Sequence, residues 1–161
     1  SNVVVKWEES VDKFQLLNIK VCKLRTGIVF AKNGGALQEM IKPIKMGVGA
    51  TFGNGNQMTS WIHIHDLAAM YLFAITNSWE KVYNAVSPFP VSNKELTIAL
   101  AKKLHKPLWL PAIPKIVMKL LLGEMHQLLF ANTNISSEKA TTAGFAFQFA
   151  KLEPALEDIL S

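Results

Sequence analysis

The alternation of apolar strands with helices constrains the fold of this chain more than any single motif does. Runs rich in branched residues, typical of β-strands, lie at 19–24, 60–64 and 82–86. Helical spacing of apolar residues separates and flanks these runs, over 1–17, 36–41, 67–76 and 92–104. Strands that alternate with helices predict the α/β class. Because only two or three core strands are visible, we expect part of a doubly wound sheet, followed by a mostly helical tail.

Capping residues set the expected ends of several helices. Ser92 is an N-cap candidate and Glu95 lies three residues on, which is the spacing of a capping box. Pro43 is expected to end the second helix, because proline donates no backbone hydrogen bond and clashes with the preceding turn. Asp66 is expected to cap the long apolar helix that follows it.

The tail predicts a small helical unit after an extended connector at 107–114. Further helices are expected at 115–122, 124–131 and 137–143, and a last one begins at Leu152. We therefore divide the chain into a sheet-forming part, residues 1–110, and a small helical C-terminal domain, residues 111–161.

The first residues form a helical pattern that has no capping lead-in. Ser1 opens the chain, and Val4, Val5 and Val11 already follow helical spacing. We therefore expect that a segment upstream has been removed. Its loss would leave the strand at 19–24 with an unpaired apolar edge, which should pair with another copy or with the missing N-terminal half.

Composition excludes several classes of protein. The chain has 161 residues and a net charge of +5, but its lysines are scattered, which is typical of a solvated surface and not of a nucleic-acid interface. Cys22 is the only cysteine, so an intrachain disulfide is impossible and a reducing compartment is favoured. No apolar run reaches the roughly 18 residues that cross a bilayer. We expect a cytoplasmic protein that binds neither membrane nor nucleic acid.

A glycine-dense loop covers 47–57, with the pattern Gly47-x-Gly49-x-x-x-Gly53. Dinucleotide-binding loops need a strand before the glycines and a helix N-terminus directly after them. Here a helix precedes the loop and a strand follows it, so we expect a flexible loop that lines a pocket. Within it, Asn54-Gly55 predicts a tight turn.

The run His63-Ile64-His65-Asp66 resembles a metal-binding strand, because alternation would put both histidines on one face. Further ligands are missing nearby, so we expect no metal: one histidine should bond to the framework. A small metal-dependent hydrolase that uses His63, His65 and Asp66 is kept as an alternative. A triad of Ser60, His63 and Asp66 is disfavoured, because three groups so close on one strand do not converge easily.

Several segments taken together resemble one family. They are Lys6-Trp7-Glu8, Leu24-Arg25-Thr26-Gly27-Ile28-Val29, Gly34-Gly35-Ala36-Leu37, Gly53-Asn54-Gly55-Asn56-Gln57 running into Ser60-Trp61-Ile62-His63-Ile64, Asn84-Ala85-Val86-Ser87-Pro88 with Val91-Ser92-Asn93, Gly123-Glu124, and Ala143-Gly144-Phe145. In this order they resemble the epimerase-like atypical short-chain dehydrogenases/reductases that end in a small C-terminal domain of unassigned function. The resemblance covers nearly all of residues 3–160.

The resemblance implies the C-terminal part of a Rossmann-like doubly wound sheet, joined to a mostly helical substrate-binding and C-terminal domain. It implies NAD or NADP as cofactor in the intact parent, and redox or epimerase chemistry on a small molecule, such as a nucleotide sugar. The family's glycine-rich phosphate turn and its Tyr-x-x-x-Lys pair are absent from these 161 residues. We therefore expect no catalytic residue here, no cofactor bound and no turnover by this chain alone. A protein-interaction module derived from the family is the alternative.

The resemblance also suggests site residues. Arg25, Thr26 and Gly27 would end the strand whose carboxyl edge faces the nicotinamide, in agreement with the rule that ligands bind at the carboxyl ends of parallel strands. The substrate pocket would be bordered by Met40, Asn54, Gln57, Trp61 and His63.

Overall fold

The computed structural model describes residues 2–113 and 133–161. Its helices are α1 (Asn2–Asp12), the 3₁₀ helix η1 (Lys13–Leu17), α2 (Gly35–Lys45), α3 (Ile64–Thr76), α4 (Asn93–Lys103), α7 (Glu138–Thr142) and α8 (Leu152–Leu160). Its strands are β1 (Cys22–Thr26), β2 (Ile28–Phe30), β3 (Met58–Thr59), β4 (Trp61–His63), β5 (Lys81–Ala85) and β6 (Val91–Ser92).

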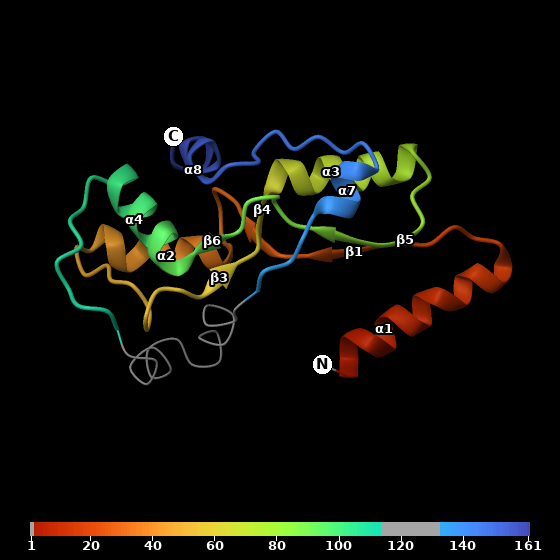
Figure 1. Cartoon of the computed structure of the whole chain (residues 1–161), viewed down its shortest axis with the longest axis horizontal. Helices are drawn as coiled ribbons and strands as arrows, with labels where there is room; N and C mark the ends of the chain where they lie inside the picture. The colour runs from red at the N-terminus through yellow and green to blue at the C-terminus, as the bar shows by residue number, and fades with distance from the viewer. Residues whose placement is uncertain (1, 114–132) are drawn as a thin grey trace.

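Two parallel strand pairs form the centre of the fold (Figure 1). β1 pairs with β5, so that Thr26 lies opposite Ala85 where both strands end. β2 pairs with β4 in the same sense, and β3 with β6 is antiparallel. Gly27 joins β1 to β2, and its N–H donates to the carbonyl of Ala85 at 3.2 Å. The α/β class with parallel strands is thus confirmed, although β1 begins at Cys22 and not at residue 19.

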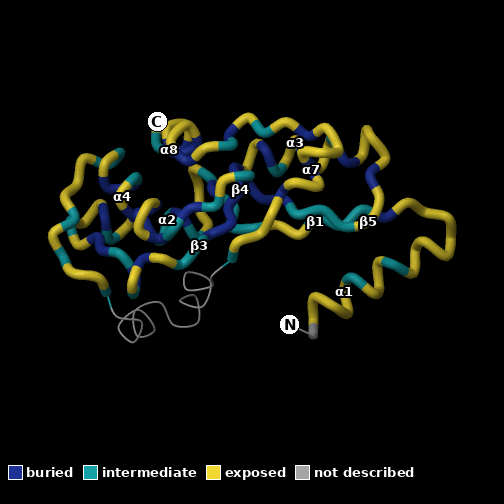
Figure 2. Tube along the Cα trace, viewed as in Figure 1, coloured by how far each residue is buried: buried dark blue, intermediate teal, exposed yellow. Residues whose placement is uncertain are grey.

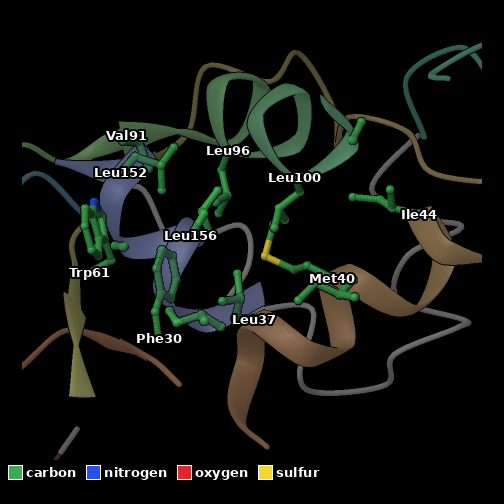
Figure 3. Packing of buried hydrophobic residues seen from close by; sticks show 14 of the residues in the cluster. Phe30, Leu37, Met40, Ile44, Trp61, Val91, Leu96, Leu100, Leu152 and Leu156 are labelled. Atoms are coloured by element: carbon green, nitrogen blue, oxygen red, sulfur yellow. The ribbon is translucent and has the colours of Figure 1, made fainter. Parts of the chain in front are cut away.

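Helices cover the strands and bury two apolar clusters. In the first, α2, α4 and α8 pack against Phe30 and Trp61 (Figure 3). In the second, α3 and α7 pack over β5, with Met70 and Phe145 among the buried side chains. Each buried side chain of this size contributes about 1.5–3 kcal/mol, so the two clusters hold the helices in place. No helix among the residues described is long and apolar enough to cross a membrane.

Helix α1 lies apart from this body (Figures 1 and 2). Its attachment is ionic: Glu8 pairs with Arg25 at 2.7 Å, and Asp12 with Lys23 at 2.8 Å. Apolar side chains of α1 and η1 face solvent, including Trp7, which is 68% exposed. The helix predicted over 1–17 is confirmed as far as Asp12, and the last turn is 3₁₀.

Two helix ends test the capping predictions. The capping box is confirmed: Ser92 Oγ accepts the N–H of Glu95 at 3.1 Å, and the N–H of Ser92 donates to the Glu95 carboxylate at 2.7 Å. The prediction that Pro43 ends α2 is wrong, because the helix continues to Lys45. Ile44 is 3% exposed, so core packing of the last turn outweighs the hydrogen bond that proline cannot make.

The tail returns across the strands after residue 132. The N–H of Thr133 donates to the carbonyl of Met58, and Ser60 Oγ donates to the carbonyl of Thr133 at 2.8 Å. The helices predicted at 137–143 and from Leu152 are confirmed as α7 and α8. The helices predicted at 115–122 and 124–131, and the Gly123-Glu124 motif, lie outside the described residues. Division of the chain at residue 110 stays a prediction.

Candidate functional site

The carboxyl ends of β1 and β5 form one edge of the candidate site. Thr26 is exposed at the end of β1, beside Ala85. The Arg25 side chain turns to α1, where its Nε and NH2 groups donate to both carboxylate oxygens of Glu8 at 2.8 and 2.7 Å. Hydrogen bonding from Arg25 holds the pKa of Glu8 below its ordinary value. The Arg25 charge is therefore paired with Glu8. The groups at this edge that remain available to a ligand are the Thr26 side chain and the backbone.

Gly27 follows directly, in a position that has no room for a side chain. A Cβ there would lie 2.5 Å from the Ser60 carbonyl oxygen and 2.8 Å from Val86 Cγ1. The same Ser60 carbonyl accepts the N–H of Ile28 at 2.9 Å. The end of β1 thus abuts Ser60, three residues after the glycine-dense loop finishes at Gln57.

The loop itself is ordered by bonds to the start of α4. The N–H groups of Asn93 and Lys94 donate to the carbonyls of Gln57 and Gly55, each at 2.9 Å. The Asn54 side chain is exposed, and its Oδ1 accepts the N–H of Asn56 at 3.1 Å. Gln57 Nε2 donates to the Phe52 carbonyl, whereas its Oε1 is buried without a hydrogen-bond partner. This loop therefore exposes the amide of Asn54, whereas the acceptor Oε1 of Gln57 is buried and unpaired.

His63 occupies the turn from β4 into α3. Its ring is 0% exposed and lies 4.0 Å, centroid to centroid, from the ring of Phe149. Nδ1 accepts the N–H of His65 at 3.2 Å, which makes His63 the N-cap of α3. Nε2 lies 3.2 Å from Asp158 Oδ2 on α8, without the alignment of a hydrogen bond. Burial lowers the pKa of His63, an effect that nearby Asp158 partly opposes.

Asp66 does not cap α3, contrary to the prediction. Its two carboxylate oxygens accept the N–H groups of Gln148 and Phe149 at 2.8 and 2.9 Å, and the residue is 2% exposed. The other half of the prediction is confirmed, since His63 bonds to the framework. Asp66 is thus committed to the tail, and Ser60 Oγ to Thr133, so neither the proposed triad nor the proposed metal set with Asp66 is assembled.

Sequence comparisons with known proteins find relatives along the whole chain. A family model described as a domain of unknown function (DUF1731) matches residues 113–159. An epimerase family protein of Staphylococcus aureus (strain MRSA252) is 35% identical over 164 residues, which cover 100% of this chain and 54% of the relative. These matches confirm the resemblance to the epimerase-like short-chain dehydrogenases/reductases. The chain spans about half the length of the curated relatives it matches.

Solved structures of this epimerase-like family share the fold. The human epimerase family protein (isoform 2), determined with NADPH, aligns with a TM-score of 0.79 and 27% identity over 87% of this chain and 48% of that chain. The nucleoside-diphosphate sugar epimerase from Corynebacterium glutamicum aligns with a TM-score of 0.76 and 24% identity over 96% of this chain and 29% of that chain. Parallel strands with flanking helices are therefore the Rossmann-like arrangement of this family.

The epimerase-like chain buries three of the residues predicted to border a substrate. Met40 is 6% exposed and points toward Leu100 in the core between α2 and α4 (Figure 3). Trp61 is 0% exposed, stacks on Phe30 at 5.0 Å, and donates from Nε1 to the carbonyl of Phe89. Like His63, these two side chains are packed among other side chains of the core and are closed to solvent. The roles of all the predicted site residues stay predictions.

Asp158 is the residue that sequence reasoning missed. It lies on α8, with Oδ2 3.2 Å from His63 Nε2, whereas the ligands expected from the sequence were histidines and a carboxylate close to them in the chain. No local pattern marks it, because α8 reaches β4 only when the tail folds back across the sheet. The prediction that His63 and His65 lie on one face of a strand is wrong, because β4 ends at His63 and His65 lies in α3. The two rings are nevertheless 5.1 Å apart.

Proposed function

We propose that this chain supplies the later sheet strands and the C-terminal unit of a cytoplasmic, NAD(P)-dependent epimerase or oxidoreductase. The substrate class is a small hydroxyl-bearing molecule of the nucleotide-sugar type. Residues 1–110 belong to the cofactor-binding sheet domain with its substrate-side insertions, and residues 111–161 to the small C-terminal domain. The proposal for the whole protein rests on the epimerase-like relatives, one of which carries NADPH.

The observation that carries this proposal is the parallel pairing of β1 with β5. Because both strands end at Thr26 and Ala85, their carboxyl ends form one edge, where ligands of doubly wound sheets bind. Arg25, Thr26 and Gly27 occupy this edge. Thr26 offers an exposed hydroxyl, the paired Arg25 fixes the position of the strand end, and Gly27 keeps the backbone close to Ser60.

On the substrate side, we assign direct contact to the amides of Asn54 and Gln57. Amide groups can both donate to and accept from sugar hydroxyls. Asn54 is exposed, and the unpaired Oε1 of Gln57, which is buried, becomes an acceptor for substrate when its side chain rotates outward. The buried Met40, Trp61 and His63 have a supporting role: they hold the segments on either side of the loop. The chemistry supplied by NAD(P) is hydride transfer, and this chain positions the substrate for it.

We expect the isolated chain to bind neither NADPH nor NADH in a calorimetric titration and to show no turnover. The reason is that its 161 residues contain no glycine-rich phosphate turn and no Tyr-x-x-x-Lys pair. Fusion of the remaining part of the Staphylococcus aureus relative ahead of residue 1 should restore NADPH binding. The control fusion carries valines in place of the phosphate-turn glycines and should not bind. Tight cofactor binding by the isolated chain would contradict the proposal.

We further propose that β1 and α1 pack against a second copy or against the remaining part of the protein. Among the described residues, β1 pairs only with β5, so its other edge is open. Exposed apolar side chains lie on α1 and η1, at Trp7, Phe14 and Leu17. The same surface favours the alternative function, an interaction module, and a specific protein captured by the isolated chain would support that alternative.

The isolated chain is therefore expected to self-associate as its concentration rises, as measured by light scattering. Trp7→Glu should weaken this association, because it places a charge within the exposed apolar surface. Tyr71→Glu is the matched control: Tyr71 is an exposed aromatic residue of α3, 51% exposed, and its replacement should leave the association unchanged. A monomer at every concentration would be evidence against this interface.

A further inference from the structure

Three side chains with metal-ligating atoms converge between the start of α3 and the end of α8. They are His63, His65 and Asp158, and one ligand atom of each lies within 4.8 Å of the other two. His63 is fully buried, and its Nε2 atom has no hydrogen-bond partner. Nε2 instead lies 3.2 Å from the Asp158 carboxylate oxygen Oδ2, so a buried imidazole nitrogen and a carboxylate meet here with a second imidazole close by.

The separation of His63 Nε2 from Asp158 Oδ2 fits a tetrahedral metal site. Bonds of about 2.0–2.1 Å at tetrahedral angles separate neighbouring ligand atoms by roughly 3.3 Å. His63 Nε2 and Asp158 Oδ2 are 3.2 Å apart, yet they are not aligned for a hydrogen bond with each other. The remaining ligand, His65, is exposed, so rotation of its side chain can shorten the 4.8 Å span.

We propose that His63, His65 and Asp158 bind a divalent transition metal of the zinc class, which fastens α8 to the N-terminus of α3. Two imidazole nitrogens and one carboxylate oxygen are ligands that zinc accepts. Water completes the fourth position, because His65 and Asp158 both border solvent. The ring of Phe149, 4.0 Å from that of His63, shields the inner side of the site.

Metal binding changes the hydrogen bonding of His63 in a defined way. Without metal, Nδ1 accepts the N–H of His65, so the proton of the neutral ring is on Nε2. Metal at Nε2 would displace this proton to Nδ1, so the bond from the His65 amide at 3.2 Å is lost and the two facing N–H groups must move apart. That amide is in an exposed first turn of α3, where water can replace the lost acceptor.

The site shares no residue with the proposed cofactor edge, because it uses the first turn of α3 and helix α8. It also differs from the metal set considered from the sequence, in which Asp66 was the third ligand. Asp66 is occupied by the amides of Gln148 and Phe149, and Asp158 takes its place. The metal has a structural role here: it connects the C-terminal helix to the sheet domain.

The test is titration of the full 161-residue chain with zinc chloride, with magnesium chloride for comparison. We expect one zinc ion to bind per chain and saturating zinc to raise the unfolding temperature, whereas magnesium does neither. His65→Ala and Asp158→Asn should each weaken zinc binding at least about 10-fold and remove the thermal shift. Neither substitution touches the buried core, so both variants should fold.

His105→Ala is the matched control, because His105 is an exposed histidine at the end of α4, outside the cluster. This variant should bind zinc as the unsubstituted chain does. The proposal is overturned if the chain binds no zinc, if His65→Ala and Asp158→Asn bind as well as the unsubstituted chain, or if His105→Ala removes binding.

Discussion

Replacement of Gly27 by alanine is expected to lower the free energy of unfolding by about 3 kcal/mol. The added Cβ would lie 2.5 Å from the Ser60 carbonyl oxygen, closer than real carbon and oxygen atoms approach. That oxygen belongs to the backbone and accepts the N–H of Ile28, so it cannot turn away without breaking the hydrogen bond between the start of β2 and the residue before β4. The Val86 side chain, at 2.8 Å, closes the remaining space.

Urea unfolding of the chain without cofactor measures this effect and separates it from any role of Gly27 in cofactor binding. Gly47→Ala serves as the control. No atom lies within 4 Å of a Cβ at Gly47, but its φ of +78° is unfavourable for alanine, so a loss of about 1 kcal/mol is expected. Equal losses in the two variants would refute crowding at Gly27 as the cause.

Replacement of Asp66 by alanine is expected to cost about 3 kcal/mol and to release the tail from α3. The carboxylate accepts two backbone N–H groups, from Gln148 and Phe149, at 2.8 and 2.9 Å. Asp66 is 2% exposed, so solvent does not readily replace the lost acceptors. Phe149 also packs on His63, and its displacement would open the core on that side.

Hydrogen exchange at Gln148 and Phe149 gives the local readout, because both amides should lose protection in Asp66→Ala. Asp12→Ala is the matched control. Asp12 also accepts two hydrogen bonds, from Lys23 Nζ at 2.8 and 2.9 Å, but its side chain is 45% exposed, and we expect a loss below about 1 kcal/mol. If the Gln148 and Phe149 amides remain protected in Asp66→Ala, Asp66 does not hold the tail.

Short-range features of this chain could be predicted from its sequence. The capping box of Ser92 and Glu95 requires residues three positions apart, and the structure has it. The order of strands and helices likewise follows from the spacing of apolar residues over a few turns. The family resemblance is a related case, because the order of many modest motifs along the chain is itself a property of the sequence.

Predictions that depended on packing were less successful. Pro43 lies within α2 because Ile41 and Ile44 are held in the core, and a local rule for proline does not include that contribution. Asp66 was expected to cap its own helix, but the tail brought two unpaired amides to it. In both cases contacts with residues distant in the sequence made the observed conformation more stable than the one that the local rule predicts.

Local patterns along the chain were enough to predict the α/β class, the family resemblance and most helix and strand positions, because these depend on neighbouring residues. Which side chains meet became visible only in the folded chain. It buried Met40, Trp61 and His63, paired Arg25 with Glu8, and placed Asp158 beside the two histidines. The physical reason is the return of the tail across the sheet. Contacts between distant segments depend on the summed packing of both clusters, which no local pattern of residues encodes.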